Sequence, residues 1–484
     1  MDMKSYEGKR WIIVYGKYEG VEKYAVDELY KLVQQYVPYI LTISTHDAKP
    51  EDIRDYNIIL IGTEESNRYI AQLKESNILT VNQNKQGYTI KVSESSFNPE
   101  RQMIILAGKD GNGTLYSVRD FEHYYCDVYL HKQFRMSGIC VPFIEEMPEY
   151  EAAGAPAVEN RGLWTWGHVI YDYKRYLDNM SRWKMNIVTI WNDYVPLNAK
   201  DIVEYAHSRG IKVIWGYSWC WGEDVNPKDE KELEKWTKRI LDTYEFQYAD
   251  TGGDGIYFQT FTETSDTIMH GLSIADLVVK WVNHIAGKLL EKYPELWIQF
   301  GLHGTSVMNE YMKLADVDPR INITWEDAGS FPYSYDPKLT ESFPKTLDFT
   351  SKICSLRGDD EDFGVVLKGM TTLDWTIFEH QKGRFILGEA KQFFIKERAK
   401  AKEKLWKYLQ AYWIKNLKYV QDTVKAIVEN NTGRVSIVAL VEDGLWEERM
   451  WQPVAMYAEL LWNPYEPSEE VIKKVALTSD SYFA

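Results

Sequence analysis

The residues with the clearest chemical potential end a strand-like run near the middle of the chain. The segment Ile256-Tyr-Phe-Gln-Thr-Phe-Thr262 is apolar and aromatic, and it ends on Glu263 with small polar residues on either side. A carboxylate at a strand end combines a rigid backbone with an open side chain, and barrels of alternating strands and helices carry their reactive groups there. We therefore predict that Glu263 is a catalytic acid. A surface glutamate that caps the next helix is the alternative.

Other carboxylates stand beside tryptophan after strand-like runs. They occur in Trp191-Asn-Asp193, Trp325-Glu-Asp327, Leu373-Asp-Trp375 and Glu442-Asp-Gly-Leu-Trp-Glu447. Cleavage of a glycosidic bond needs one protonated and one ionised carboxyl group on opposite sides of that bond. The candidates for the ionised partner of Glu263 are Glu326, Asp327 and Asp374. Because neighbouring residues of a strand point to opposite faces, at most one of Glu326 and Asp327 is expected to face the site.

Aromatic residues around these acids predict a lined pocket. The chain has 18 Trp, 34 Tyr and 17 Phe, and core filling accounts for many of them. Apolar sugar faces, however, favour an aromatic platform. Tyr257, Phe258 and Phe261 are expected to pack on Glu263 and keep it protonated near neutral pH. The tryptophans expected to line one pocket are Trp164, Trp166, Trp191, Trp219, Trp221, Trp325, Trp375 and Trp446.

Polar candidates for binding ring hydroxyls complete the predicted site. They are Arg161, Asn192, Asp193, His303 and Glu447. Arg161 offers bidentate donors, although an ion pair at the barrel rim accounts for it equally well. A single histidine such as His303 is more often a structural group than a catalytic one. Neither H-E-x-x-H nor G-x-S-x-G spacing occurs, so we expect no metal, no cofactor and no serine-elbow esterase.

The elements that must position these residues form two regions. Residues 1–145 are expected to form a small α+β domain, with strands at 11–15, 57–62, 88–92 and 103–107 and a helix at 21–35. Residues 146–484 show strand and helix patterns in alternation. Predicted barrel strands cover 161–166, 187–191, 212–217, 255–261, 297–301, 321–325, 365–368 and 435–440.

Eight such strands predict an α/β fold, a closed (β/α)8 barrel preceded by the small α+β domain. A doubly wound open sheet is the structural rival, but no glycine-rich phosphate turn follows its first strand. The run Asp110-Gly-Asn-Gly113 is expected to be a turn. Pro142 to Glu159 is expected to be a connector.

The composition limits the classes of partner that we expect for the protein. The formal net charge of −16 argues against a nucleic-acid surface. The four cysteines lie far apart without CxxC spacing, and no stretch approaches about 18 consecutive apolar residues. We expect a cytoplasmic protein without a membrane partner; a homo-oligomer is compatible with the sequence.

Several segments resemble two glycoside hydrolase families, the family 67 α-glucuronidases and the family 20 hexosaminidases. Ile104-Ile-Leu-Ala-Gly-Lys-Asp-Gly-Asn-Gly-Thr-Leu-Tyr116 and Glu22-Lys-Tyr-Ala-Val-Asp-Glu-Leu29 resemble their small amino-terminal domain. Glu159-Asn-Arg-Gly-Leu163 and the segment from Tyr173 to Asn186 resemble their first barrel strand and helix. Val441-Glu-Asp-Gly-Leu-Trp-Glu447 and Glu459-Leu-Leu-Trp462 are similar to the last strand and helix of hexosaminidases.

The resemblance implies an activity. Gly255-Ile-Tyr-Phe-Gln-Thr-Phe-Thr-Glu263 is similar to the α-glucuronidase strand in which a small hydroxyl residue precedes the general acid, whereas hexosaminidases have Asp-Glu there. It implies a glycosidase that removes a terminal uronic acid or N-acetylhexosamine from a carbohydrate. The absence of aspartate at Thr262 motivates the alternative, a non-catalytic carbohydrate-binding protein on a degenerate barrel. The strand-four match favours inversion of configuration.

Overall fold

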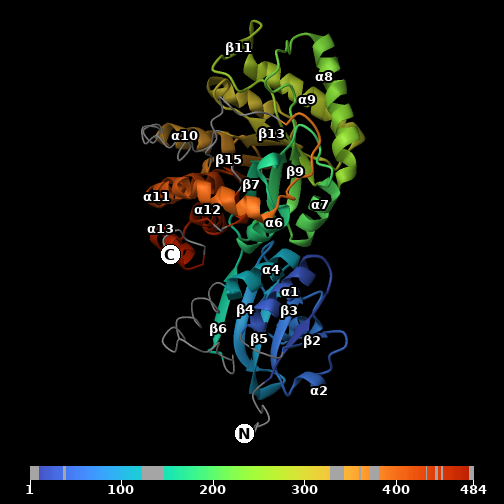
Figure 1. The fold of residues 1–484 in the computed structure, drawn as a ribbon, viewed down its shortest axis with the longest axis vertical. Helices are drawn as coiled ribbons and strands as arrows, with labels where there is room; N and C mark the ends of the chain where they lie inside the picture. Colours follow the sequence, from blue (N-terminus) through green and yellow to red (C-terminus); the bar gives the residue numbers. More distant parts are fainter. Residues whose placement is uncertain are drawn as a thin grey trace. The chain divides into compact units, whose positions relative to one another are not determined.

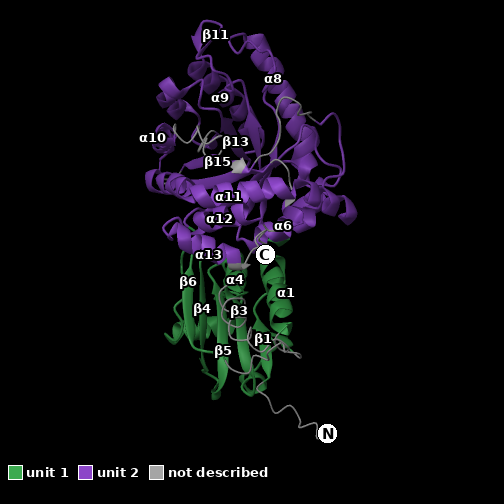
Figure 2. Ribbon diagram, turned by 60° about the vertical axis from the view of Figure 1, so that its left-hand side comes forward, with its two compact units in different colours: residues 1–156, 207–210 green, residues 157–206, 211–484 purple. Residues whose placement is uncertain are grey.

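The computed structural model describes residues 10–35, 40–122, 147–326, 343–358, 361–370, 381–431, 433–441, 445–448 and 451–478. These residues divide into two compact units, one formed by 1–156 with 207–210 and the other by 157–206 with 211–484 (Figure 2). The division falls after residue 156 rather than at 145 because strand β6 (Tyr150–Gly154) pairs with β4 in the small unit. Part of the expected connector is therefore a strand.

The first unit is a mixed sheet with helices. Its sheet has the order β2-β1-β3-β5-β4-β6, parallel from β2 to β5 and antiparallel beyond. The strands are β1 (Trp11–Tyr15), β2 (Leu41–Ser44), β3 (Asn57–Thr63), β4 (Tyr88–Ser95), β5 (Asn98–Gly108) and β6. The helices are α1 (Gly20–Gln34), α2 (Pro50–Ile53), α3 (Arg68–Glu75) and α4 (Gly111–Asp120).

Asp110-Gly-Asn-Gly113 is the beginning of α4 rather than an isolated turn. The side chain of Asp110 accepts a hydrogen bond from Gly113 N at 2.9 Å and so caps the helix. Gly113 lies so close to Gly87 O that a Cβ there would approach it to 2.1 Å. The two glycines in this run thus reflect a cap and a close packing contact.

The second unit is a closed barrel of parallel strands (Figure 1). Its strands, in chain order, are β7 (Asn160–Trp166), β8 (Ile187–Trp191), β9 (Lys212–Gly216), β10 (Gly255–Gln259), β13 (Trp297–Leu302), β14 (Ile321–Trp325), β15 (Asp362–Met370) and β16 (Arg434–Val441). A short hairpin of β11 (Ile268–Met269) and β12 (Leu272–Ser273) follows β10. The predicted closed barrel is confirmed, with each strand within a few residues of its expected place.

Helices alternate with the barrel strands. They are α6 (Tyr173–Arg182), α7 (Ala199–Ser208), α8 (Glu230–Thr243), α9 (Ile274–Lys292), α10 (Phe343–Cys354), α11 (Gln392–Asn430), α12 (Gln452–Trp462) and α13 (Ser468–Thr478). Shorter helical turns are η2 (Gly167–Val169), η3 (Tyr244–Tyr248), η4 (Ala249–Thr251), η5 (Met308–Asp316) and η8 (Leu445–Glu447). In the described part of the chain, no helix is both long enough and apolar enough to cross a bilayer.

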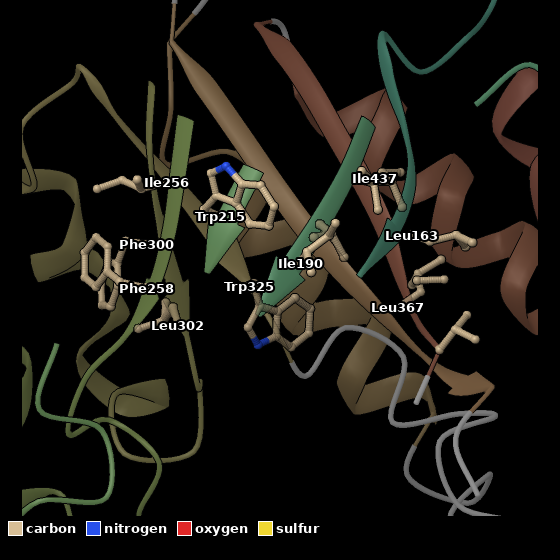
Figure 3. Close-up of a cluster of buried hydrophobic side chains, with 14 of the residues drawn as sticks. Leu163, Ile190, Trp215, Ile256, Phe258, Phe300, Leu302, Trp325, Leu367 and Ile437 are labelled. Carbon is tan, nitrogen blue, oxygen red and sulfur yellow. The ribbon is translucent and has the colours of Figure 1, made fainter. Parts of the chain in front are cut away.

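Alternation along the strands separates two buried groups of side chains. One set forms the core between strands and helices, and Figure 3 shows its members from all eight barrel strands, including Leu163, Phe258 and Trp325. The other set fills the barrel interior and includes Trp164, Trp166, Trp191 and Tyr257. The period of two therefore decides which residues can reach a site inside the barrel.

Candidate active site

The side chain of Glu263 is accessible to solvent at the end of a barrel strand. It follows β10, the fourth barrel strand, and its side chain is 50% exposed. One carboxylate oxygen accepts a hydrogen bond from Trp221 Nε1, and the same oxygen lies 3.7 Å from His303 Nε2. Glu263 is thus held by an indole and an imidazole at the carboxyl end of the barrel, the end where reactive groups of this fold lie.

The aromatic packing expected around Glu263 is absent. Phe258 stacks between Trp219 and Phe300, with ring centroids 3.6 and 5.3 Å away, on the helix side of the strand. Phe261 packs edge-on against Trp281. Tyr257 points into the barrel and donates its hydroxyl to Glu326. The prediction that these three rings surround Glu263 was therefore wrong, because strand alternation and the turn after β10 direct them elsewhere.

Glu326 is the second carboxylate of the site. It follows Trp325 at the end of β14 and is buried, with 3% of its side chain exposed. Its Oε2 lies 3.2 Å from His303 Nε2 and 3.6 Å from Lys368 Nζ, while Oε1 accepts from Tyr257 and Gln259. Burial by itself would raise the pKa of Glu326, but His303, Lys368 and Tyr257 outweigh it and hold that pKa well below its usual range.

The two carboxylates share one histidine. His303 follows β13, and its backbone N–H donates to Thr262 Oγ1 at 3.4 Å. Because His303 Nε2 contacts Oε2 of both acids, these oxygens lie no more than about 7 Å apart. That limit includes the separations of both retaining glycosidases, about 5–5.5 Å, and the closest inverting ones, about 6.5 Å and above.

Indoles form the opposite part of the barrel interior. Trp166 and Trp191 end the first two strands and meet at a centroid distance of 5.6 Å. Trp191 also contacts Trp221, at 5.9 Å, and donates from Nε1 to Asp193 at 3.3 Å. The structure therefore brings together the predicted residues Glu263, Glu326, His303, Trp166 and Asp193.

Three predicted tryptophans lie away from this group. Trp219 stacks on Phe258, Trp325 packs against Phe349 with ring centroids 5.1 Å apart, and Trp446 lies 6.4 Å from Trp451. All three belong to the core between strands and helices and are almost completely buried. Their assignment to one pocket was wrong because large apolar side chains at strand ends face the helices as readily as the interior.

Arg161 is a structural residue at the other end of the barrel. It is the second residue of β7, about 16 Å of strand before Trp166. Its buried guanidinium donates to the carbonyls of Val158, Glu159 and Lys184 at 2.7–3.1 Å. The expectation that it binds substrate is contradicted, because its position in the strand and its hydrogen bonds direct it to the amino-terminal face.

Glu447 and Asn192 are both buried. Glu447 Oε1 accepts from the backbone N–H groups of Tyr171 and Asp172 at the start of α6. Burial raises the pKa of Glu447 to about 8 despite these hydrogen bonds. Asn192 lies against Gly167, with 1% of its surface exposed. Glu447 therefore holds the segment that leads into α6, and its role in binding stays a prediction.

Asp327, Asp374 and Trp375 lie outside the described residues. The sequence interpretation missed Gln259 and Lys368, which join the interior wall. A sequence signal for Lys368 exists, since one cation ends the otherwise apolar run Val365-Val-Leu-Lys368. Among the described residues, no group of three or more His, Cys, Asp or Glu is arranged to hold a metal ion.

Comparisons with known proteins bear on the fold. No protein-family model matches the chain, and no curated protein matches it. Solved structures resemble it at low identity. CpGH84D has a TM-score of 0.53 and 13% identity, with 96% of this chain and 67% of that chain covered.

Two further structures resemble the chain to a similar degree. BtGH115A, a family GH115 4-O-methyl-α-glucuronidase with specificity for decorated arabinogalactans, has a TM-score of 0.55 and 14% identity; 97% of this chain matches 58% of its length. A β-N-acetylhexosaminidase from Bacteroides fragilis NCTC 9343 has a TM-score of 0.53 and 12% identity, with 98% and 93% covered. This chain thus spans less than two thirds of BtGH115A. The likenesses support the barrel with a preceding small domain.

Proposed function

We propose that the protein is a glycoside hydrolase that removes a terminal sugar by carboxylate acid/base catalysis. The observation that carries the proposal is the half-exposed carboxylate of Glu263, which accepts from Trp221 Nε1 at the carboxyl end of the barrel and lies beside His303. The facing indoles Trp166 and Trp191 supply the apolar surface that a sugar ring needs. Three structural neighbours described as glycosidases or as family GH84 agree with this class.

Glu263 is the general acid of this proposal. Its exposure allows a leaving-group oxygen to reach it, and its position after the fourth strand matches the resemblance in the sequence. Trp221 Nε1 fixes the carboxyl group from one side. Protonation of the leaving oxygen by such a residue contributes about 10²–10⁴-fold to the rate.

The catalytic base is proposed to be Asp327 or Asp374. Glu326 remains ionised, but all of its contacts are with donors, so it offers no oxygen to an attacking water. A carboxylate held with a low pKa is also a weak base. Asp327 directly follows Glu326, and Asp374 lies six residues beyond Lys368 in the sequence.

The sugar is proposed to be a uronic acid in preference to an N-acetylhexosamine. Attack by a substrate's own acetamide group is helped by an aspartate before the acid, and this chain has Thr262 there. Thr262 is fully buried; its hydroxyl accepts from His303 N, and its carbonyl accepts from Ser306. It therefore cannot replace an aspartate.

A panel of nitrophenyl glycosides tests the proposal. We expect release of nitrophenol from a uronide, or from an N-acetylhexosaminide if the sugar assignment is wrong. On a glycoside of the same sugar with a basic leaving group, turnover by Glu263→Gln should fall by about 10²–10⁴-fold. The alternative function, carbohydrate binding without hydrolysis, is favoured by the fully occupied carboxylate of Glu326. Sugar binding detected by calorimetry with no nitrophenol release across the panel would establish that alternative.

A further inference from the structure

The buried carboxylate of Glu326 is an anchor for the side chains around it, because donors contact both of its oxygens. Four donors from three strands converge on its carboxylate: Tyr257 and Gln259 from β10, His303 after β13 and Lys368 from β15. Each oxygen faces two of them. A buried carboxylate in this position fixes the side chains around it, because moving any one of them leaves a charge or a donor without its partner.

His303 is the donor that joins this anchor to the proposed acid. Its Nε2 lies 3.2 Å from Glu326 and 3.7 Å from Glu263. The nearby anion of Glu326 favours a proton on the imidazole. The titratable groups that the structure describes around this pair are Glu263, Tyr257 and Lys368.

We infer that Glu326 is a positioning residue that keeps the imidazole of His303 protonated, and that His303 in turn orients the carboxyl group of Glu263. The first step, from Glu326 to His303, is a property of the folded protein. The second step rests on the proposed function, because it concerns the residue that is proposed to be the acid.

The first step is tested by NMR of the full chain with ¹⁵N-labelled histidine, with the His303 signal assigned by its loss in His303→Gln. We expect Glu326→Gln to move the titration midpoint of His303 down by about one pH unit or more. Glu326→Asp keeps the charge and should retain most of the wild-type midpoint. Glu459→Gln is the matched control, since Glu459 is another buried glutamate, paired with Lys184 and Lys474.

These spectra decide the first step without any enzymatic activity. A His303 midpoint that is equal in the wild type, Glu326→Gln and Glu459→Gln would overturn the inference, even if Glu326→Gln lowered the melting temperature. If Glu326→Gln does not fold, Glu326→Asp and the wild type remain informative. A His303 ring that is neutral throughout the range from pH 5 to 8 in the wild type would overturn it as well.

The second step is tested by the kinetics of His303→Gln on a glycoside that the wild type hydrolyses. We expect kcat to fall about tenfold or more with KM nearly unchanged, because the imidazole that lies 3.7 Å from Glu263 is lost. A kcat equal to that of the wild type would overturn the second step alone. If no glycoside is hydrolysed, the proposed function fails, and a shifted His303 midpoint would still establish Glu326 as the positioning residue.

Discussion

Glu263 and Glu326 are both glutamates at strand ends, and their surroundings give them different chemistry. Glu263 is half exposed and has two neighbours, whereas Glu326 is buried among four donors. An acid catalyst must reach solvent and substrate, while a buried and saturated carboxylate serves mainly to hold charge. The surroundings of these two glutamates thus distinguish two roles that the residue type alone does not distinguish.

The assignment of Glu263 makes a direct prediction. Glu263→Gln keeps the shape of the side chain but cannot protonate a leaving oxygen, so kcat on a glycoside with a basic leaving group should fall by about 10²–10⁴-fold. KM and the melting temperature should change little. Asp266→Asn, on the same exposed loop, is the matched control and should retain wild-type turnover. Near-native turnover by Glu263→Gln would show that another group is the acid.

At the scale of elements, the start of α6 depends on Glu447. Its carboxyl group accepts from two backbone N–H groups there, and burial raises its pKa from 4.5 to about 8. The folded state therefore binds this proton more tightly than the unfolded state does. The contribution of Glu447 to the free energy of unfolding is therefore complete below pH 4.5. It decreases by about 1.4 kcal/mol per pH unit as the pH rises towards 8.

Glu447→Gln should remove this dependence. The amide oxygen can still accept from Tyr171 and Asp172, and the group no longer ionises. In urea unfolding measured from pH 5 to 9, the stability of the variant relative to the wild type should therefore increase up to about pH 8. Glu448→Gln, next in the chain and partly exposed, should follow the wild-type curve. Parallel curves for wild type and Glu447→Gln would contradict a raised pKa of Glu447 in the folded protein.

The amino end of β7 gives the second prediction at this scale. Arg161→Met removes hydrogen bonds to three buried carbonyl groups, so the free energy of unfolding should fall by about 3 kcal/mol or more. KM should not change, because Arg161 lies at the face opposite the site. Arg175→Met, which removes a half-exposed ion pair, should cost at most about 1 kcal/mol. A raised KM with an unchanged free energy of unfolding would show that Arg161 binds substrate.

At the scale of the whole molecule, the site is assembled from most of the barrel. The first two strands supply indoles, the fourth leads to Glu263, and the fifth, sixth and seventh supply His303, Glu326 and Lys368. Closure of the barrel is what brings these strand ends to one face. A change that opens the barrel should therefore abolish the site as a unit.

The stereochemical outcome is a further prediction for the whole site. The fourth barrel strand, with Thr262 before Glu263, is similar to that of α-glucuronidases, and we expect a water to attack the sugar directly. The product should then have the inverted anomeric configuration. NMR of the first-formed product checks this. A product with the configuration of the substrate would instead indicate a covalent or substrate-assisted route, and would favour an N-acetylhexosamine.

The sequence by itself determined the barrel and indicated that the candidate site lies at the carboxyl ends of its strands. Apolar runs about 30 residues apart, separated by amphipathic stretches, are local patterns, and short connections leave a closed parallel barrel as their solution. Glu263 could be chosen because it ends such a run. Strand alternation is also local, so the sequence implied that at most one of Glu326 and Asp327 faces the site.

Only the tertiary structure decided which side of each strand faces the interior and what meets there. Trp219, Trp325 and Trp446 look like Trp166 and Trp191 in the sequence, yet they pack against helices. Arg161 lies at the amino end of its strand, away from the site. Lys368 contacts Glu326 although the two residues are 42 positions apart in the sequence. Such contacts depend on strand register and barrel closure, which side-chain type and spacing along one chain do not specify.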